Sequence, residues 1–161
     1  MKTARQLFTD SFKAERPKFQ RVFDAVPAKE SGYKPHPRSC SAADLVWTIA
    51  SEWGDACELI DHGRVNFAPK SAPDVKTSLS TFEKNAAGIE KRLETLDDRA
   101  WEKNAQFFMD GKVVWEGPLG DMLLGFLFDA IHHRGQLSTY LRPMGAKVPS
   151  IYGPSADDPG Q

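Results

Sequence analysis

The sequence lacks most of the features that mark extracellular, membrane or nucleic-acid-binding proteins. Its 161 residues include only two cysteines, so no disulfide framework is expected. No stretch approaches the roughly 20 apolar residues that a membrane-spanning helix needs, and the first ten residues lack the apolar segment of a signal peptide. With 21 basic and 22 acidic residues, the chain has no excess of positive charge to attract nucleic acid. We therefore expect a cytoplasmic protein that binds neither membranes nor nucleic acid.

The overall composition of the chain is typical of a soluble globular protein. Hydrophobic residues make up 40% of the chain and charged residues 27%. A chain of this length is long enough to bury a substantial core. We expect one domain over residues 1–161, with an irregular tail over residues 143–161 that is rich in proline and glycine.

Four segments carry apolar residues at steps of three and four, the spacing of a single buried helix face. They predict helices over residues 3–26, 41–62, 72–96 and 119–142. Pro17 falls inside the first segment and should kink that helix, because proline cannot donate the backbone hydrogen bond.

The ends of the second segment carry recognisable start and stop signals. Ser41 is a suitable N-cap, and Asp44, three residues later, can complete a capping box. Gly63 suits the C-terminal end of the same helix. The preceding residues 27–40 are rich in proline and glycine and predict a loop.

A β-hairpin is predicted between the third and fourth helices. Residues 104–117 hold two apolar-rich runs on either side of Asp110-Gly111, a pair that favours a two-residue hairpin turn. Four long amphipathic helices with one small hairpin predict an all-α fold, a four-helix bundle in which metal or cofactor sites would lie on facing helices.

The segment FDAIHHRGQ, residues 128–136, places polar groups on an apolar helix. At 100° per residue, His133 falls within the apolar stripe and Asp129 lies at its edge. The two side chains are four residues apart and therefore neighbours. His132 points to nearly the opposite face, so the adjacent histidines should have different roles. Gly135, inside the same helix, suggests the close approach of another helix or of the tail.

The second helix repeats this arrangement. Glu52 falls within its apolar stripe, and Thr48 lies at the edge. If the second and fourth helices face each other, Glu52, Asp129 and His133 converge. One histidine and two carboxylates can bind a divalent ion and leave positions open for water or substrate.

A structural role is the alternative for the same residues. An inward histidine is often satisfied by a hydrogen bond alone, and a His–Asp pair one helical turn apart can be an ion pair. In that case Glu52 could pair with Arg134 or with a backbone donor. The aliphatic stem of Arg134 is expected to pack near the stripe, and its head could pair with Glu52 or with an anionic substrate.

The segment HHRGQLSTYLRPMGAKVPSIYGPS resembles the C-terminal signature of the DinB/YfiT-like superfamily. The resemblance implies a four-helix bundle and a divalent metal, such as nickel or zinc, held by three histidines. His133 matches one of these ligands, whereas Asp129 and Thr48 stand at or near the positions of the other two. Asp129 can still bind a metal, while Thr48 is a poor ligand. Glu52, one turn away, could replace it from the same side. We expect a site that binds a metal more weakly, binds a harder ion such as Mn²⁺ or Mg²⁺, or stays empty.

The resemblance implies a metal-dependent enzyme. Some members transfer low-molecular-weight thiols, and hydrolysis by a metal-bound water is equally compatible with such a centre. Glu52 would be a ligand or general base, with Thr48 and Arg134 lining the pocket. The alternative is a non-catalytic homodimeric bundle without metal that serves in a stress response or binds a small molecule. A homodimer is expected in either case, and Trp47 and Phe128, on outward faces, would suit its interface.

Overall fold

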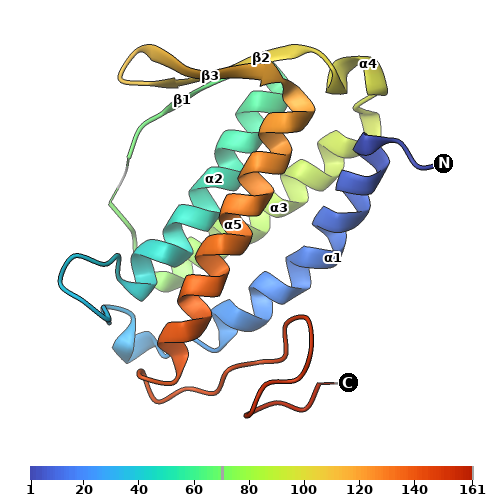
Figure 1. The fold of residues 1–161 in the computed structure, drawn as a ribbon. Coiled ribbons are helices and arrows are strands. Elements are labelled where there is room, and N and C mark those ends of the chain that lie inside the picture. The colour runs from blue at the N-terminus through green and yellow to red at the C-terminus, as the bar shows by residue number, and fades with distance from the viewer. Residues whose placement is uncertain (70, 161) are drawn as a thin grey trace.

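The computed structural model describes residues 1–69 and 71–160 and shows four long helices closed at one end by a small sheet (Figure 1). α2 packs against α3 and α5, and α1 packs against the same two helices on the opposite side. The predicted bundle is therefore confirmed. The long helices are α1 (Ala4–Asp24), α2 (Ala42–His62), α3 (Val75–Thr95) and α5 (Leu119–Leu141).

The local signals in the sequence place the ends of α2 and the start of α3. Ser41 accepts a hydrogen bond from the backbone of Asp44, whose side chain accepts one from the backbone of Ser41, so the predicted capping box is present. Gly63 ends α2 in the left-handed conformation, with φ of 66°. Asp74 caps α3 by accepting from the backbone of Thr77.

The sheet contains one more strand than the sequence analysis predicted. β2 (Asn104–Met109) and β3 (Lys112–Pro118) form the expected hairpin, and its two turn residues both have positive φ, 50° at Asp110 and 74° at Gly111. β1 (Arg64–Phe67) pairs in parallel with β2, giving the order β1-β2-β3. A four-residue strand at a sheet edge has too few positions to show an alternating pattern.

Two short helices were also missed, α4 (Asp98–Trp101) and the 3-10 helix η1 (Ala28–Glu30). Each is a single turn or less, too short for apolar periodicity to reveal it. α4 nevertheless matters for packing, because Trp101 lies against Gly120 in the first turn of α5. A side chain larger than hydrogen at position 120 would collide with the indole ring.

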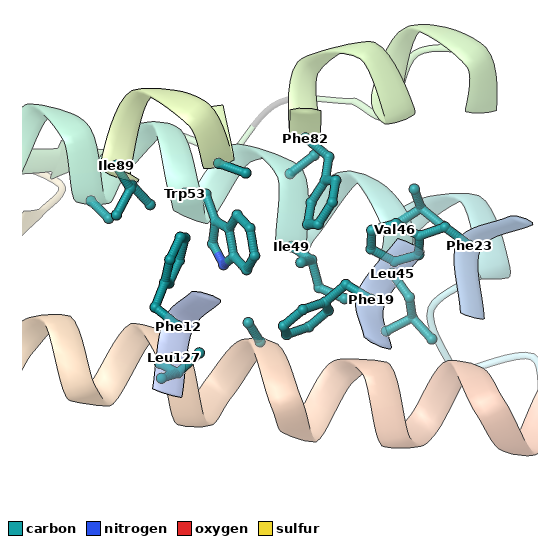
Figure 2. Close-up of a cluster of buried hydrophobic side chains, with 14 of the residues drawn as sticks. Phe12, Phe19, Phe23, Leu45, Val46, Ile49, Trp53, Phe82, Ile89 and Leu127 are labelled. Atoms are coloured by element: carbon teal, nitrogen blue, oxygen red, sulfur yellow. The ribbon is translucent and has the colours of Figure 1, made fainter. Parts of the chain in front are cut away.

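The core is built around Trp53 of α2, which is 1% exposed (Figure 2). Its ring centroid lies 4.7 Å from that of Phe12, 5.0 Å from that of Phe19 and 4.5 Å from that of Phe82. These rings come from α1 and α3, so one tryptophan joins three of the long helices. Burial of each such ring stabilises the fold by about 1.5–3 kcal/mol.

Three further expectations can be compared with the structure. Phe128 is 63% exposed, whereas Trp47 is half-buried and packs against the core, so of these two rings that of Phe128 is the freely exposed one. Gly135 does not mark a close helix approach, because a Cβ there would meet no atom within 4 Å.

In the described part of the chain, no helix is both long and apolar enough to cross a membrane.

Candidate metal centre

α2 and α5 bring three potential ligands together, as their helical positions predicted. Glu52 comes from α2, and Asp129 and His133 come from successive turns of α5. His133 Nε2 lies 3.3 Å from Asp129 Oδ2 and 3.9 Å from Glu52 Oε1. One ligand atom from each residue falls within 4.8 Å of the other two. This is the donor set of a small-ion site with one nitrogen and two oxygen ligands.

Glu52 is held in an environment that opposes its negative charge. The side chain is only 11% exposed. Burial, the neighbouring Asp129 carboxyl group and Asp55 together raise the pKa of Glu52 to about 9. Its Oε2 atom is buried and has no hydrogen-bond partner among the described residues. A buried carboxylate without a donor is costly, and a cation would offset that cost.

His133 presents one ring nitrogen to the two carboxyl groups and the other to an amide. Its Nδ1 lies 2.9 Å from Gln136 Oε1. An amide oxygen can only accept, so Nδ1 is the donor if the oxygen of this amide faces the ring. In the neutral ring, Nε2 then holds a lone pair that faces Asp129 and Glu52. Such an orientation is that of a metal-ligating histidine whose second nitrogen is fixed by a hydrogen bond.

The donor set fits a divalent ion of hard or borderline character. Two carboxylates balance the charge of such an ion, and the imidazole adds one ligand that Zn²⁺, Ni²⁺ and Mn²⁺ all accept. Three protein ligands leave positions open, as in catalytic rather than structural sites. Glu52, Asp129 and His133 would hold the ion.

A groove of about 620 Å³ runs along the outer face of α2, between this helix, α3 and the segment that follows β1. Glu52 belongs both to the groove and to the triad of possible ligands. Thr48 lines the groove one helical turn before Glu52, as expected for a pocket residue. The α3 wall carries the cations Lys84 and Arg92. A ligand in the groove would therefore contact the same glutamate that faces His133.

Arg134 is placed differently from the sequence expectation. It is 1% exposed, and its Nη1 donates to Glu15 Oε2 of α1 over 2.6 Å rather than to Glu52. Its Nη2 donates to the hydroxyl of Tyr152 in the C-terminal tail. Successive helix residues point about 100° apart, so the residue after His133 faces α1 and not the α2 groove.

Gln136 is the functional residue for which the sequence reasoning found no role. It stands three residues after His133, a spacing at which helical side chains meet. That spacing was the available signal, because a metal-ligating histidine needs a partner for its second nitrogen.

Comparison with known proteins identifies the family. A sequence model described as the DinB family matches residues 1–160. The chain belongs to the DinB family. The resemblance seen in the HHRGQ segment is thus confirmed, and the match extends over nearly the whole chain. No curated protein sequence matches this one.

Solved structures of DinB-like proteins share the fold. One from Bacillus subtilis, YjoA, is 23% identical, with a TM-score of 0.67 over 88% of this chain and 93% of that one. Another, from Bacillus cereus, is 20% identical, with a TM-score of 0.73 over 90% and 95%. The mycothiol-dependent maleylpyruvate isomerase is 12% identical, with a TM-score of 0.62 over 91% of this chain and 64% of that one. The bundle with its small sheet is therefore a DinB-like fold.

Proposed function

We propose that this DinB-family protein is a divalent-metal-dependent transferase that activates a low-molecular-weight thiol at Glu52, Asp129 and His133. The observation that carries the proposal is the convergence of three ligand atoms from α2 and α5 within 4.8 Å of one another. Glu52 Oε2, buried and without a partner among the described residues, supports it. A purely structural polar seam would leave this oxygen unsatisfied.

A divalent ion held by these residues would lower the pKa of a thiol bound to it and so supply a thiolate at neutral pH. The residues of the chain would orient the ligands and accept the proton. Gln136 would hold the ring of His133 through Nδ1 and so leave Nε2 to act as the ligand. Glu52 turns Oε1 toward His133, and its Oε2 is the atom that can hold the proton released by the thiol.

The thiol would come from a substrate rather than from the chain. Cys57 is half-buried, burial raises the pKa of its thiol, and its Sγ donates to the backbone oxygen of Asn85. Cys40 is exposed outside the triad. The isomerase that shares this fold is mycothiol-dependent, so one protein with this fold uses a low-molecular-weight thiol. The groove beside Glu52 offers space for a small thiol.

Metal content is the first test. Untagged protein would be incubated with Mn²⁺, Ni²⁺ or Zn²⁺, desalted and measured for metal per chain, alongside His133→Ala and Asp129→Asn. His62→Ala is the matched control, because His62 is an exposed histidine of α2 outside the triad. We expect about one ion per chain in the wild type and in the control, with loss in the other two. If the wild type binds no metal, the metal-dependent function is wrong and the alternative, a non-catalytic bundle without metal, is favoured.

A second measurement separates thiol transfer from hydrolysis. In Co²⁺-loaded protein, addition of a small thiol should produce a thiolate-to-cobalt absorption band in the near ultraviolet. The band should be absent in His133→Ala. If thiols produce no band while the loaded protein hydrolyses model esters, the centre activates water and the protein is a hydrolase.

A further inference from the structure

The outer face of α5, turned away from the bundle, carries apolar side chains. Phe128 on this face is 63% exposed, and Leu124 and Ile131 are partly exposed. Trp115 of β3 extends the face, because its ring packs over Gly125 of the same helix. In Figure 1, α5 crosses the front of the bundle, with the other long helices beside or behind it. Since the inner face of α5 already fills the core, an apolar outer face indicates an interaction surface.

Gly135 leaves an open space on this outer face, seven residues after Phe128. A Cβ at this position would meet no atom of the described chain within 4 Å. Glycine inside a helix lowers the stability of the helix relative to alanine, and no contact within the chain accounts for its presence. Glycine also lets a group from elsewhere approach the backbone closely. The space therefore suits a side chain from another molecule.

The two ends of the outer face carry opposite charges. Asp121 is exposed in the first turn of α5. Arg142 follows the last turn, bonds Asp157 through Nε and has a side chain that is 54% exposed, so its Nη groups can pair with a second carboxylate. Asp121, Phe128, Gly135 and Arg142 are each seven residues apart. Because a helix drifts by only about 20° in seven residues, these four positions follow one line along it.

We propose that two copies of this chain form a homodimer in which the outer faces of α5 pack antiparallel, about a two-fold axis between positions 131 and 132. In this register, Phe128 of each copy enters the space at Gly135 of the other. The same register sets Asp121 opposite Arg142 of the second copy. Each pairing occurs twice, as an interface between identical surfaces requires. A shallow crossing of about 20° keeps the charged helix ends within reach of each other.

The two kinds of contact have different roles in this dimer. Phe128 supplies the buried aromatic anchor, the kind of residue on which binding energy concentrates. Exposed charge pairs add little affinity, but they select the orientation of the two copies. A parallel arrangement would set Asp121 against Asp121 and Phe128 against Phe128, so that neither the charges nor the open space would find a complement.

Analytical ultracentrifugation of the untagged protein tests the anchor and its space. Phe128→Ala should weaken dimerisation by about 30-fold or more, because each substitution is present twice. Leu7→Ala is the control, since Leu7 is 60% exposed on α1. Gly135→Leu should weaken the dimer similarly while the helical circular dichroism is kept. Exchanging ring and space in the double variant Phe128→Ala, Gly135→Phe should restore the dimer to within about tenfold of the wild type.

Disulfide cross-linking tests the antiparallel register, in a chain with Cys40 and Cys57 replaced by serine. His132→Cys lies next to the proposed axis, so it faces its own copy and should cross-link on oxidation. Thr139→Cys is the matched control on the same face. Its sulfur and that of the second copy would lie about 22 Å apart along the helices, too far for a disulfide. Equal cross-linking of both variants would overturn the antiparallel arrangement.

Charge reversal provides the final test. Asp121→Lys should weaken the dimer by about tenfold at low salt and less at high salt, and adding Arg142→Glu should restore it. Glu94→Lys, an exposed position of α3, is the control that should have no effect. The proposal is overturned if the wild type stays monomeric up to about 1 mM. It is also overturned if a dimer forms that Phe128→Ala and Gly135→Leu leave unchanged.

Discussion

Arg134 and Glu15 form a buried ion pair that joins α5 to α1 across 119 positions of the chain, with Nη1 donating to Oε2 over 2.6 Å. The Arg134 and Glu15 side chains are only 2% and 10% exposed. Burial alone would raise the pKa of Glu15, but hydrogen bonds from Lys18, Arg134 and Tyr152 outweigh it, and the pKa lies below its ordinary value. The carboxylate is therefore charged in the folded protein and depends on its partners.

Removing one member of this pair should destabilise the protein strongly. Arg134→Met leaves the Glu15 carboxylate buried without its guanidinium, at a cost of about 3–5 kcal/mol. The double variant with Glu15→Leu removes both charges and should regain most of the loss. Urea denaturation measures both free energies of unfolding. A double variant as unstable as Arg134→Met would show that the shape of the arginine, and not its charge, is what the site requires.

Glu52 should make the metal-free protein less stable as the pH rises. Its folded-state pKa of about 9 lies above the ordinary value of 4.5. The stabilisation it contributes is therefore fully present below pH 4.5 and is lost as the pH rises toward 9. Between pH 4.5 and 7 the loss is roughly 3 kcal/mol.

Urea denaturation in the presence of a chelator at several pH values tests this dependence. Glu52→Gln, a neutral mimic of the protonated acid, should flatten it, while Glu58→Gln at an exposed position of the same helix should not. An unchanged pH dependence in Glu52→Gln would contradict the raised pKa.

Thr48→His should strengthen metal binding. The family resemblance implies a histidine at or near this position, and Thr48 lies one turn before Glu52 in the same groove. An added imidazole should raise Zn²⁺ or Ni²⁺ affinity by about tenfold or more and shift preference away from Mn²⁺. Ser51→His is the control, since it adds the same ring elsewhere in the groove. Equal gains in both variants would mean that any nearby histidine suffices.

Two glycines of α5 should respond in opposite directions to alanine. A Cβ at Gly120 would lie 2.1 Å from Trp101 Cε2, so Gly120→Ala should cost about 1–3 kcal/mol through displacement of the ring. At Gly135 a Cβ meets nothing within 4 Å, and alanine should stabilise the helix by about 0.5–1 kcal/mol. Thermal unfolding of both variants provides the measurement, and a stabilised Gly120→Ala would contradict the close contact with Trp101.

The two cysteines should differ in reactivity toward iodoacetamide. Cys40 is exposed, whereas Cys57 is half-buried and burial raises the pKa of its thiol. Mass spectrometry at neutral pH should find Cys40 alkylated well before Cys57. Cys40→Ser serves as the reference that isolates the Cys57 rate. Rapid alkylation of Cys57 would indicate an activated thiol in the groove and would argue against a thiol supplied only by the substrate.

Local signals account for how well the sequence predicted the fold. Ser41 with Asp44, Gly63 and the Asp110-Gly111 turn each act through bonds or backbone angles within a few residues. The meeting of Glu52 with Asp129 and His133 was also predictable, since it follows from two apolar stripes and the assumption that they face each other. That inference needed only the angular position of each residue around its helix, and no interatomic distance.

The remaining features depend on residues far apart in the chain. β1 is defined by its pairing with β2, which begins 40 positions later. The partner of Arg134 lies on α1, and nothing near position 134 indicates Glu15. At Gly135 the sequence suggested a contact that does not exist. A glycine in a helix suggests the close approach of another segment, but a Cβ at this position would meet no atom within 4 Å.

The cluster of Glu15, Arg134 and Tyr152 also bears on the order of events during protein synthesis. Tyr152 donates to the same Glu15 oxygen that Arg134 binds, and both partners are translated long after α1. Of the three groups that bond the Glu15 carboxylate, only Lys18 belongs to α1 itself. The full set of partners of this buried charge is therefore complete only after the C-terminal tail has been synthesised.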